Sequence, residues 1–233
     1  MALNDLKGPR QRSIVIAIDG PAGAGKSTVA KELARRLGYA YLDTGAMYRA
    51  LTLKALRKKE DLEDESALVA LAKKTSIDID RDEKKSLKVL LDGEDVTEAI
   101  RSNEVTKNTA YIARTPGVRA LMVKRQREIG KAKNVVVEGR DIGTVVFPQA
   151  AKKFYLDADF KERSQRRIAE LKNKGSDVSE TSIASDLRER DTKDLTRAVG
   201  PLKKADDAIR IDSTNLSIEE VVAKILNLIK PHG

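Results

Sequence analysis

The sequence lacks several residue types and patterns that would point to particular classes of protein. It has 233 residues with no cysteine, so disulfides and thiolate metal sites are excluded, which fits a reducing cytoplasm. The only histidine is His232, and we expect neither a catalytic histidine nor a histidine-based metal cluster. No apolar run approaches the roughly 20 residues of a membrane helix, and residues 1–12 lack the apolar core of a secretory signal. These absences predict a protein of the cytoplasm.

Basic residues outnumber acidic ones by 45 to 36, which gives a formal net charge of +9. This balance favours anionic partners, and both RNA and small phosphates fit it. A nucleotide-dependent RNA-binding protein would need aromatic side chains on which bases stack, but aromatic residues make up only 3% of the chain and tryptophan is absent. RNA binding therefore remains a distant alternative, and the sequence motifs have to decide between RNA and small phosphates as partners.

The length suits one α/β domain with an insertion. Residues 13–18 form a continuous apolar run typical of a strand buried on both faces, and residues 26–37 carry apolar residues at helical spacing. A short strand is expected over 39–42 and a helix over 46–59. Strand, glycine-rich turn, helix, strand and helix in this order indicate a doubly wound parallel sheet.

The pattern changes over residues 61–103 and returns to α/β after Val118. Residues 77–80 alternate between apolar and polar, and 87–91 read as a strand with a turn at Asp92-Gly93, which indicates a small antiparallel insert. Later strands are expected at 135–137, 154–156 and 209–211, and helices at 118–129, 161–174, 179–190 and 218–229. The predicted division is a core domain of 13–60 and 104–230, an insert of 61–103 and a mobile basic tail of 1–12.

Residues 20–27, Gly-Pro-Ala-Gly-Ala-Gly-Lys-Ser, match the phosphate-binding pattern G-x-x-x-x-G-K-[ST]. The motif lies between a buried strand and a helix, where backbone N–H groups and the helix N-terminus can surround a phosphate. Lys26 can bridge the β- and γ-phosphates, and the Ser27 hydroxyl can bind Mg²⁺. The predicted nucleoside triphosphate site consists of Gly20, Pro21, Ala22, Gly23, Ala24, Gly25, Lys26, Ser27 and Thr28.

Arginines occur in three further segments that suit a phosphate acceptor. Residues 43–49 follow the second strand, 138–141 follow the strand at 135–137, and 189–201 lie toward the C-terminus. Ligands of α/β folds bind at the carboxyl ends of the strands, so the first two segments should share that edge of the sheet. Arginine pairs with phosphate oxygens through its planar fork and stays charged. The candidate acceptor-binding arginines are Arg49, Arg140, Arg190 and Arg197.

Five motifs in this order resemble those of the bacterial cytidylate kinases, P-loop nucleoside monophosphate kinases that act on CMP and dCMP. They are G-P-A-G-A-G-K-S-T, L-D-T-G-A-M-Y-R, G-V-R ending at Arg119, V-E-G-R-D-I-G-T-V-V-F-P and R-D-x-x-D-x-x-R-A-V-G-P-L, and they are spread over residues 14–230. The resemblance implies a three-layer α/β P-loop NTPase fold with a parallel five-stranded sheet. It also implies an inserted α+β substrate-binding domain and a helical lid at about 163–190.

The resemblance also implies a role for each site residue. Arg49 and Arg140 would grip the acceptor phosphate, and Arg119 and Asp141 would contact the cytosine. The whole substrate-binding set is Thr44, Tyr48, Arg49, Arg119, Arg140, Asp141, Arg190, Asp194 and Arg197, and the catalytic set is Lys26, Arg140, Arg190 and Arg197. On the ATP side the implied residues are the lid arginines Arg163, Arg166 and Arg167, of which Arg166 would cover ATP, and Glu138, which would orient water bound to Mg²⁺ beside Ser27.

One position departs from the family pattern. The family has a serine that contacts the base about nine residues before the arginine that corresponds to Arg119, and this chain has Ala110 there, beside Thr109. Either Thr109 takes over this contact or one hydrogen bond to cytosine is missing. We expect a monomeric, Mg²⁺- and ATP-dependent kinase of CMP and dCMP that binds neither nucleic acid nor membrane. A UMP-accepting or other small-molecule P-loop kinase is the alternative.

Overall fold

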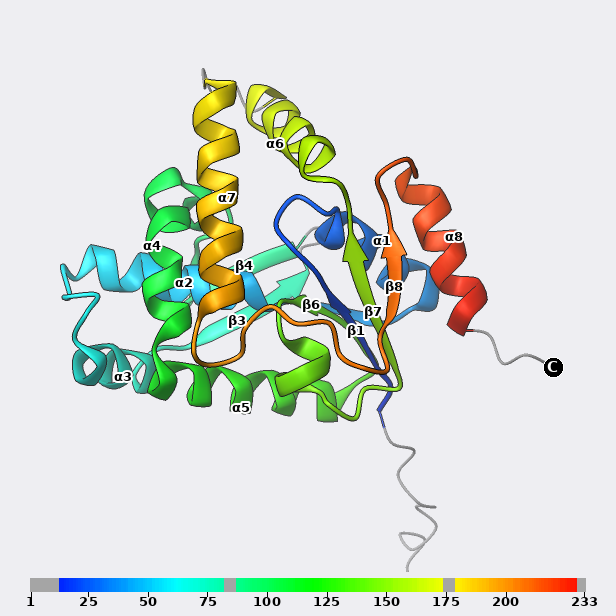
Figure 1. The fold of residues 1–233 in the computed structure, drawn as a ribbon. Coiled ribbons are helices and arrows are strands. Elements are labelled where there is room, and N and C mark those ends of the chain that lie inside the picture. Colours follow the sequence, from blue (N-terminus) through cyan, green and yellow to red (C-terminus); the bar gives the residue numbers. More distant parts are fainter. Residues whose placement is uncertain (1–12, 82–86, 174–178, 230–233) are drawn as a thin grey trace, which may run out of the picture.

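A computed structural model describes residues 13–81, 87–173 and 179–229; the predicted basic tail and His232 lie outside these ranges. The core is a five-stranded, wholly parallel sheet with the strand order β2-β6-β1-β7-β8 (Figure 1), which confirms the predicted fold class. Its strands are β1 (Val15–Asp19), β2 (Ala40–Asp43), β6 (Val135–Gly139), β7 (Lys152–Asp157) and β8 (Ile209–Asp212).

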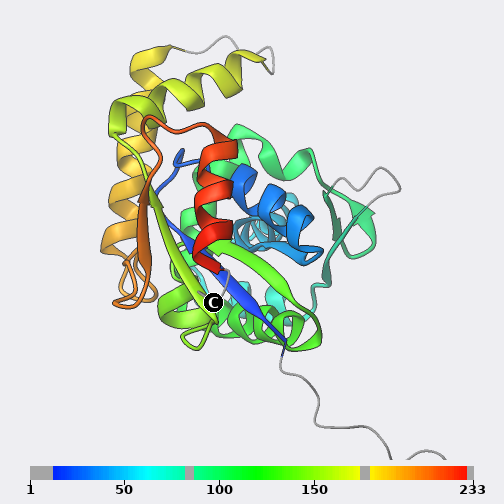
Figure 2. The ribbon, with the colours of Figure 1, turned by 90° about the vertical axis from the view of Figure 1, so that its right-hand side faces the viewer.

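Strand β1 is central because alternate residues fill the core on both faces of the sheet. Ile16 and Ile18 pack against α1 (Lys26–Leu37) and α8 (Ile218–Ile229) on one face (Figure 2). Val15 and Ala17 belong to the core on the other face, which α2 (Thr44–Arg57) and α5 (Pro116–Ala132) cover. A strand buried on both faces needs an apolar run, which residues 15–18 supply, and only the last residue of β1, Asp19, is polar. The molecule therefore has three layers.

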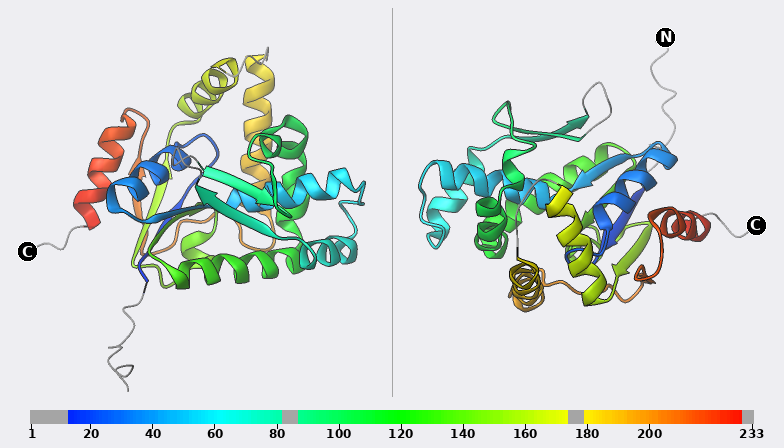
Figure 3. Two further views of the ribbon diagram at one scale, coloured as in Figure 1. Left: turned by 180° about the vertical axis from the view of Figure 1, so that it is seen from behind. Right: turned by 90° about the horizontal axis from the view of Figure 1, so that it is seen from above.

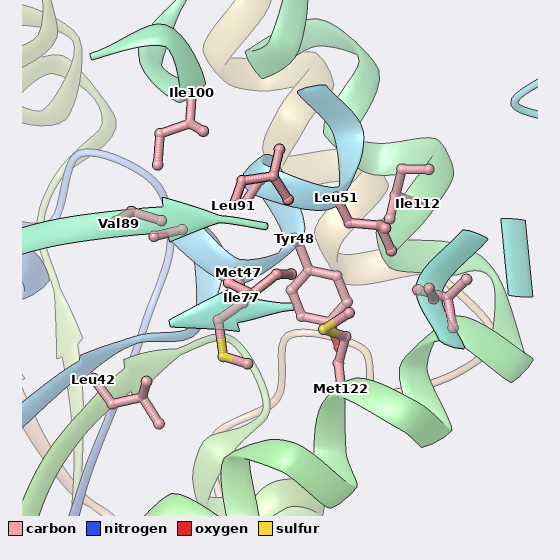
Figure 4. Close-up of a cluster of buried hydrophobic side chains, with 14 of the residues drawn as sticks. Leu42, Met47, Tyr48, Leu51, Ile77, Val89, Leu91, Ile100, Ile112 and Met122 are labelled. Atoms are coloured by element: carbon pink, nitrogen blue, oxygen red, sulfur yellow. The ribbon is translucent and has the colours of Figure 1, made fainter. Parts of the chain in front are cut away.

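The inserted segment forms a separate antiparallel sheet, β3-β4-β5, as its alternating pattern predicts (Figure 3). The elements are α3 (Glu65–Lys73), β3 (Ile77–Arg81), β4 (Leu87–Leu91), β5 (Glu94–Asp95) and the 3₁₀ turn η1 (Ala99–Arg101). The apolar side chains Ile77, Val89 and Leu91 point toward Met47 and Leu51 of α2 (Figure 4). The insert thus shares one hydrophobic core with the larger sheet.

Helix α4 (Asn103–Arg114) was not predicted from the sequence. Val105 and Ile112, its buried residues, lie seven positions apart on one helical face, so the apolar signal was present in the sequence but rests on two residues. Its boundaries have local causes: the Ser102 hydroxyl accepts from the Val105 N–H at 3.3 Å, and Pro116 begins α5. The helix expected at 118–129 is real but runs from Pro116 to Ala132.

Two helices, α6 (Phe160–Asn173) and α7 (Glu180–Thr196), stand above the carboxyl edge of the sheet (Figure 1). Helix α7 was expected to end near Arg190, but it continues to Thr196 and therefore carries both Arg190 and Asp194. A π-helical turn, η2 (Ile142–Val146), follows β6. Within the described ranges, no helix is long and apolar enough to cross a bilayer.

Candidate active site

The P-loop follows β1 and ends at Gly25, the N-cap of α1, which has φ +86°. Two glycines are required by close approach as well as by their backbone angles. A Cβ on Gly20 would lie 2.0 Å from the carbonyl oxygen of Leu156, and one on Gly23 would lie 3.0 Å from that of Arg163. The loop is therefore wedged between β7 and α6, and larger residues cannot replace these glycines.

A cavity of about 690 Å³ opens at the carboxyl edge of the sheet, between the P-loop and α2, α4, α6 and α7. The structure brings most of the predicted site residues to its wall: Ala22, Gly23, Gly25, Lys26, Ser27, Thr28, Thr44, Tyr48, Arg49, Arg119, Glu138, Arg140, Asp141, Arg166, Arg190, Asp194 and Arg197. Gly20, Pro21 and Ala24 are buried in the P-loop and are not among the lining residues.

Lys26 is 5% exposed, and its ammonium donates to the carbonyl of Pro21 at 2.5 Å. Burial, and then the positive charge of Arg140, lower the pKa of Lys26 to about 7. Glu138 lines the same cavity, and burial followed by the charge of Asp43 raises the pKa of its carboxyl. The charges of Glu138 and Asp194 oppose the lowering of the Lys26 pKa, and a bound phosphate would add further negative charge beside the ammonium.

Hydrogen bonds connect the carboxyl end of β2 to the carboxyl end of β6. The Tyr41 hydroxyl donates to the Glu138 carboxylate, and the Thr44 hydroxyl donates to the Glu138 carbonyl at 2.7 Å. Asp43 caps α2 by accepting from the Ala46 N–H at 2.8 Å, and its second oxygen accepts from Arg49 at 2.8 Å. These contacts fix Arg49 on the first turns of α2, beside the cavity.

Arg119, Asp141 and Arg197 form an ion-pair cluster deep in the cavity. Arg119 is 2% exposed and pairs with Asp141, and its other terminal nitrogen donates to the Ala113 carbonyl at 3.1 Å. Arg197 lies 3.3 Å from the second Asp141 oxygen. Burial raises the pKa of Asp141, and the two arginines oppose this shift. In the described chain the Nε atoms of Arg49 and Arg119 are buried and have no acceptor.

Arg140 and Arg190 bring two further positive charges to the cavity. Arg140 pairs with Asp194 at 2.7 Å. Burial, followed by the charges of Arg140 and Arg49, lowers the pKa of Arg190 to about 10, which reports how closely these cations are gathered. An anion between them would relieve this repulsion.

The three lid arginines differ in position. Arg166 lines the cavity and donates to the Ser213 carbonyl at 2.7 Å, and Arg167 lines it while pairing with Glu170 at 2.8 Å. Arg163 does not line the cavity: it is 8% exposed and bonded to protein groups. Arg163 therefore lacks the access to ATP that the lid position implied.

Several residues at this site were missed from the sequence, among them Lys31, Arg101, Thr106 and Ile218, which line the cavity. Asp19, the last residue of β1, is also buried; its carboxylate accepts from the N–H groups of Ile142 and Gly143 at 2.8 and 2.7 Å. Burial raises the pKa of Asp19 to about 6, although these N–H groups lower it. These hydrogen bonds connect β1 to the segment after Asp141. The only sign of them in the sequence was a charged residue at the end of an apolar strand.

Comparison with known proteins identifies the family. The cytidylate kinase family pattern matches residues 16–231, nearly the whole chain. This chain belongs to the cytidylate kinase family. A cytidylate kinase of Caldanaerobacter subterraneus subsp. tengcongensis is 49% identical over 94% of this chain and 95% of its own length. One of Desulforamulus reducens is 52% identical over 92% of this chain and 96% of its own.

A solved structure of an uncharacterized protein from Eubacterium ventriosum has a similar fold, with a TM-score of 0.51, 12% identity and coverage of 94% of this chain and 100% of that one. At this identity the likeness concerns the fold alone. A cytidylate kinase needs a donor nucleotide and an acceptor nucleotide side by side, and this cavity is lined both by the P-loop and by the arginine cluster.

Proposed function

We propose that this chain transfers the γ-phosphoryl group of ATP to the phosphate of CMP or dCMP. One observation carries the proposal: a single cavity of about 690 Å³ is lined both by the P-loop and by a cluster of arginines. The P-loop with Lys26 would hold the phosphates of ATP, and Arg49, Arg140 and Arg190 would hold the acceptor phosphate. The cytidylate kinase family supports this assignment.

The chemistry requires positioning and charge neutralisation rather than a strong base. The attacking atom is an oxygen of the acceptor phosphate, which is already ionised at neutral pH. Charge builds up on the transferring group and its neighbours, and Lys26, Arg140, Arg190 and Arg197 are placed to compensate it. Holding both nucleotides in line supplies much of the remaining rate enhancement.

Magnesium fits the donor set of the cavity. Ser27 and Glu138 offer a hydroxyl and a carboxylate on the same wall, and oxygen ligands are what Mg²⁺ prefers. The described residues contain no group of three or more His, Cys, Asp or Glu side chains that could hold an ion alone. Ser27 would bind the ion directly and Glu138 through water, with the substrate phosphates as the other ligands. When bound, Mg²⁺ neutralises charge on the phosphates.

Thr109 is our candidate for the contact that the family makes through a serine. Thr106, Thr109 and Ala113 of α4 line the cavity. Ala110 does not, and it lines a neighbouring pocket that shares these three residues. The Thr109 hydroxyl donates its proton to the Val105 carbonyl at 2.6 Å. Its oxygen is therefore left as an acceptor, which suits the amino group of cytosine and not the carbonyl oxygen of uracil.

We also propose the division of labour that the sequence suggested. Residues 61–103 would contribute to binding the monophosphate, since Arg101 lines the cavity. Residues 163–190 would act as a lid, since Arg166, Arg167 and Arg190 also line the cavity. Because ATP and CMP are cytoplasmic metabolites, we place the enzyme in the cytoplasm.

The decisive experiment is ADP formation with ATP and Mg²⁺ across CMP, dCMP, UMP, AMP and GMP. We expect ADP with CMP and dCMP and much less with the others. Turnover of UMP comparable to that of CMP would keep the reaction and replace the acceptor, in line with a missing hydrogen bond at Ala110. A folded sample that binds ATP and forms no ADP with any acceptor would overturn the proposal. Steep salt-dependent RNA binding would instead favour the RNA-binding alternative.

A further inference from the structure

Asp191 is the acidic residue of the segment 190–197 that the proposed reaction does not use. It lies on α7 between Arg190 and Asp194, which both line the cavity, but Asp191 does not line it. Its carboxylate instead faces the P-loop. One oxygen accepts from Arg163 at 2.6 Å, and the other lies 3.4 Å from the N–H of Ala22.

Arg163 completes the connection from the side of α6. The nitrogen that pairs with Asp191 also donates to the carbonyl of Ala22 at 2.9 Å, and its Nε donates to the carbonyl of Ala158 at 3.0 Å. The backbones also touch here, because a Cβ on Gly23 would lie 3.0 Å from the Arg163 carbonyl oxygen. The P-loop, α6 and α7 therefore meet at the peptide groups flanking one residue, Ala22.

The contact is largely shielded from solvent and holds the P-loop by its backbone. The side chains of Arg163 and Asp191 are 10% and 14% exposed, so little solvent competes for their charges. Ala22 is held at both its N–H and its C=O, while Gly23 beside it lines the ATP half of the cavity. Asp191 is less than one helical turn from both Arg190 and Asp194, so displacing it displaces them.

We propose that Arg163 and Asp191 are positioning residues that couple the two halves of the site. A triphosphate that orders the P-loop fixes Ala22, Ala22 holds the Arg163–Asp191 pair, and the pair sets α7 so that Arg190 and Asp194 face the acceptor. Binding of one nucleotide therefore tightens binding of the other, and the coupling is reciprocal. This inference rests on the proposed function, because it assigns ATP and CMP to the two halves.

The coupling is measured by calorimetric titration of CMP, alone and with the non-hydrolysable analogue AMP-PNP and Mg²⁺. The ratio of the two dissociation constants is the coupling factor, and we expect it to be about fivefold or more in the wild type. Asp191→Asn should bring the factor close to one, while each nucleotide alone binds within about twofold of wild type, since neither Asp191 nor Arg163 lines the cavity. Arg163→Lys should do the same, because a lysine cannot reach three acceptors at once.

Glu189→Gln is the matched control, the same change from carboxylate to amide two residues earlier on α7. Glu189 pairs with Lys193 at 2.5 Å, and its side chain is 63% exposed. This variant should keep the wild-type coupling factor, and thermal unfolding identifies any variant that does not fold. A wild-type factor of one, an unchanged factor in Asp191→Asn, or an equal loss in Glu189→Gln would each overturn the inference. The proposed function fails separately, if the wild type forms no ADP with CMP.

Discussion

At the scale of single residues, the cavity holds a lysine whose charge depends on its ligand. The pKa of Lys26 is lowered to about 7 by burial and by Arg140, and the negative charge of a phosphate beside the ammonium would oppose both causes. ATP binding should therefore raise this pKa. Near pH 8 the free enzyme has mostly neutral Lys26, and the complex has mostly charged Lys26.

We predict that ATP binding at pH 8 takes up close to one proton. The sign follows from the direction of the shift: a group whose pKa rises on binding gains protons when the pH lies between its two pKa values. Calorimetry in buffers of different ionisation enthalpy measures this uptake. Lys26→Met, which cannot titrate, should lose it, and uptake would persist in this variant if another group were responsible. At pH 6 the uptake should be much smaller.

Gly200 is a residue whose size matters because of its neighbours. It has φ +61°, and a Cβ there would lie 2.2 Å from an Asp141 oxygen and 2.3 Å from an Arg119 nitrogen. Gly200→Ala must push apart the Arg119–Asp141 pair, which the family resemblance implies contacts the cytosine. We expect the KM for CMP to rise about tenfold or more, with the KM for ATP little changed, in steady-state assays.

Gly38→Ala separates this effect from backbone strain. Gly38 has φ +67°, nearly the same as Gly200, but a Cβ at this position would meet no other atom within 4 Å. Both variants should lose about 1–2 kcal/mol of stability from the left-handed backbone, and only Gly200→Ala should change the KM for CMP. Equal effects of the two on this KM would contradict the assignment.

At the scale of elements, the orientation of α4 decides which of two adjacent residues reaches the acceptor. Thr109 lines the cavity, and Ala110, one residue on, lies on the neighbouring face toward α7. Successive helical residues are turned by about 100°. The departure at Ala110 therefore places an apolar residue outside the cavity rather than leaving a gap in its wall.

We predict that Thr109→Val raises the KM for CMP about three- to tenfold and reduces the preference for CMP over UMP. Valine keeps the shape of threonine and removes the one oxygen, so the loss reflects the hydrogen bond. Turnover of CMP and UMP by the same preparation measures the preference. Ala110→Ser is the companion variant and should leave the preference unchanged. A larger effect at position 110 than at 109 would contradict this orientation of α4.

At the scale of the whole molecule, the inserted sheet and the parallel sheet are joined by one apolar core. Leu91 of β4 and Leu51 of α2 belong to the same cluster as Val137 of β6 (Figure 4 shows the first two). Elements that share a buried core lose each other's packing when one of them opens. The insert should therefore unfold together with the rest of the chain.

We predict that Leu91→Ala lowers the free energy of unfolding by about 2–5 kcal/mol in a single transition. Leu91 is 4% exposed, so its removal leaves a cavity. Urea unfolding followed by circular dichroism and by tyrosine fluorescence should give coincident curves. Leu195→Ala, at a position that is 55% exposed, should cost much less. A separate early transition in Leu91→Ala would mean that the insert is independent.

The sequence by itself determined the features that depend on neighbouring residues. The P-loop is one run of residues, 20–27, whose glycines, lysine and serine follow from what a phosphate needs. The parallel sheet was also predictable, because residues 15–18 of β1 form an apolar run that the two layers bury, and only its last residue, Asp19, is polar. Some helices were less predictable. Helix α4, which has two buried residues, was missed, and α7 extends past its expected end.

Only the tertiary structure decided which distant groups meet. Arg119, Asp141 and Arg197 lie far apart in the chain, and they touch because α5, β6 and the end of α7 converge at one edge of the sheet. Arg163 belongs to an arginine-rich helix like Arg166, yet the fold turns it to the P-loop and away from the cavity. Local sequence sets a side chain's chemistry, but its partner depends on the path of the whole chain, and charged groups offer no periodic pattern that reveals it.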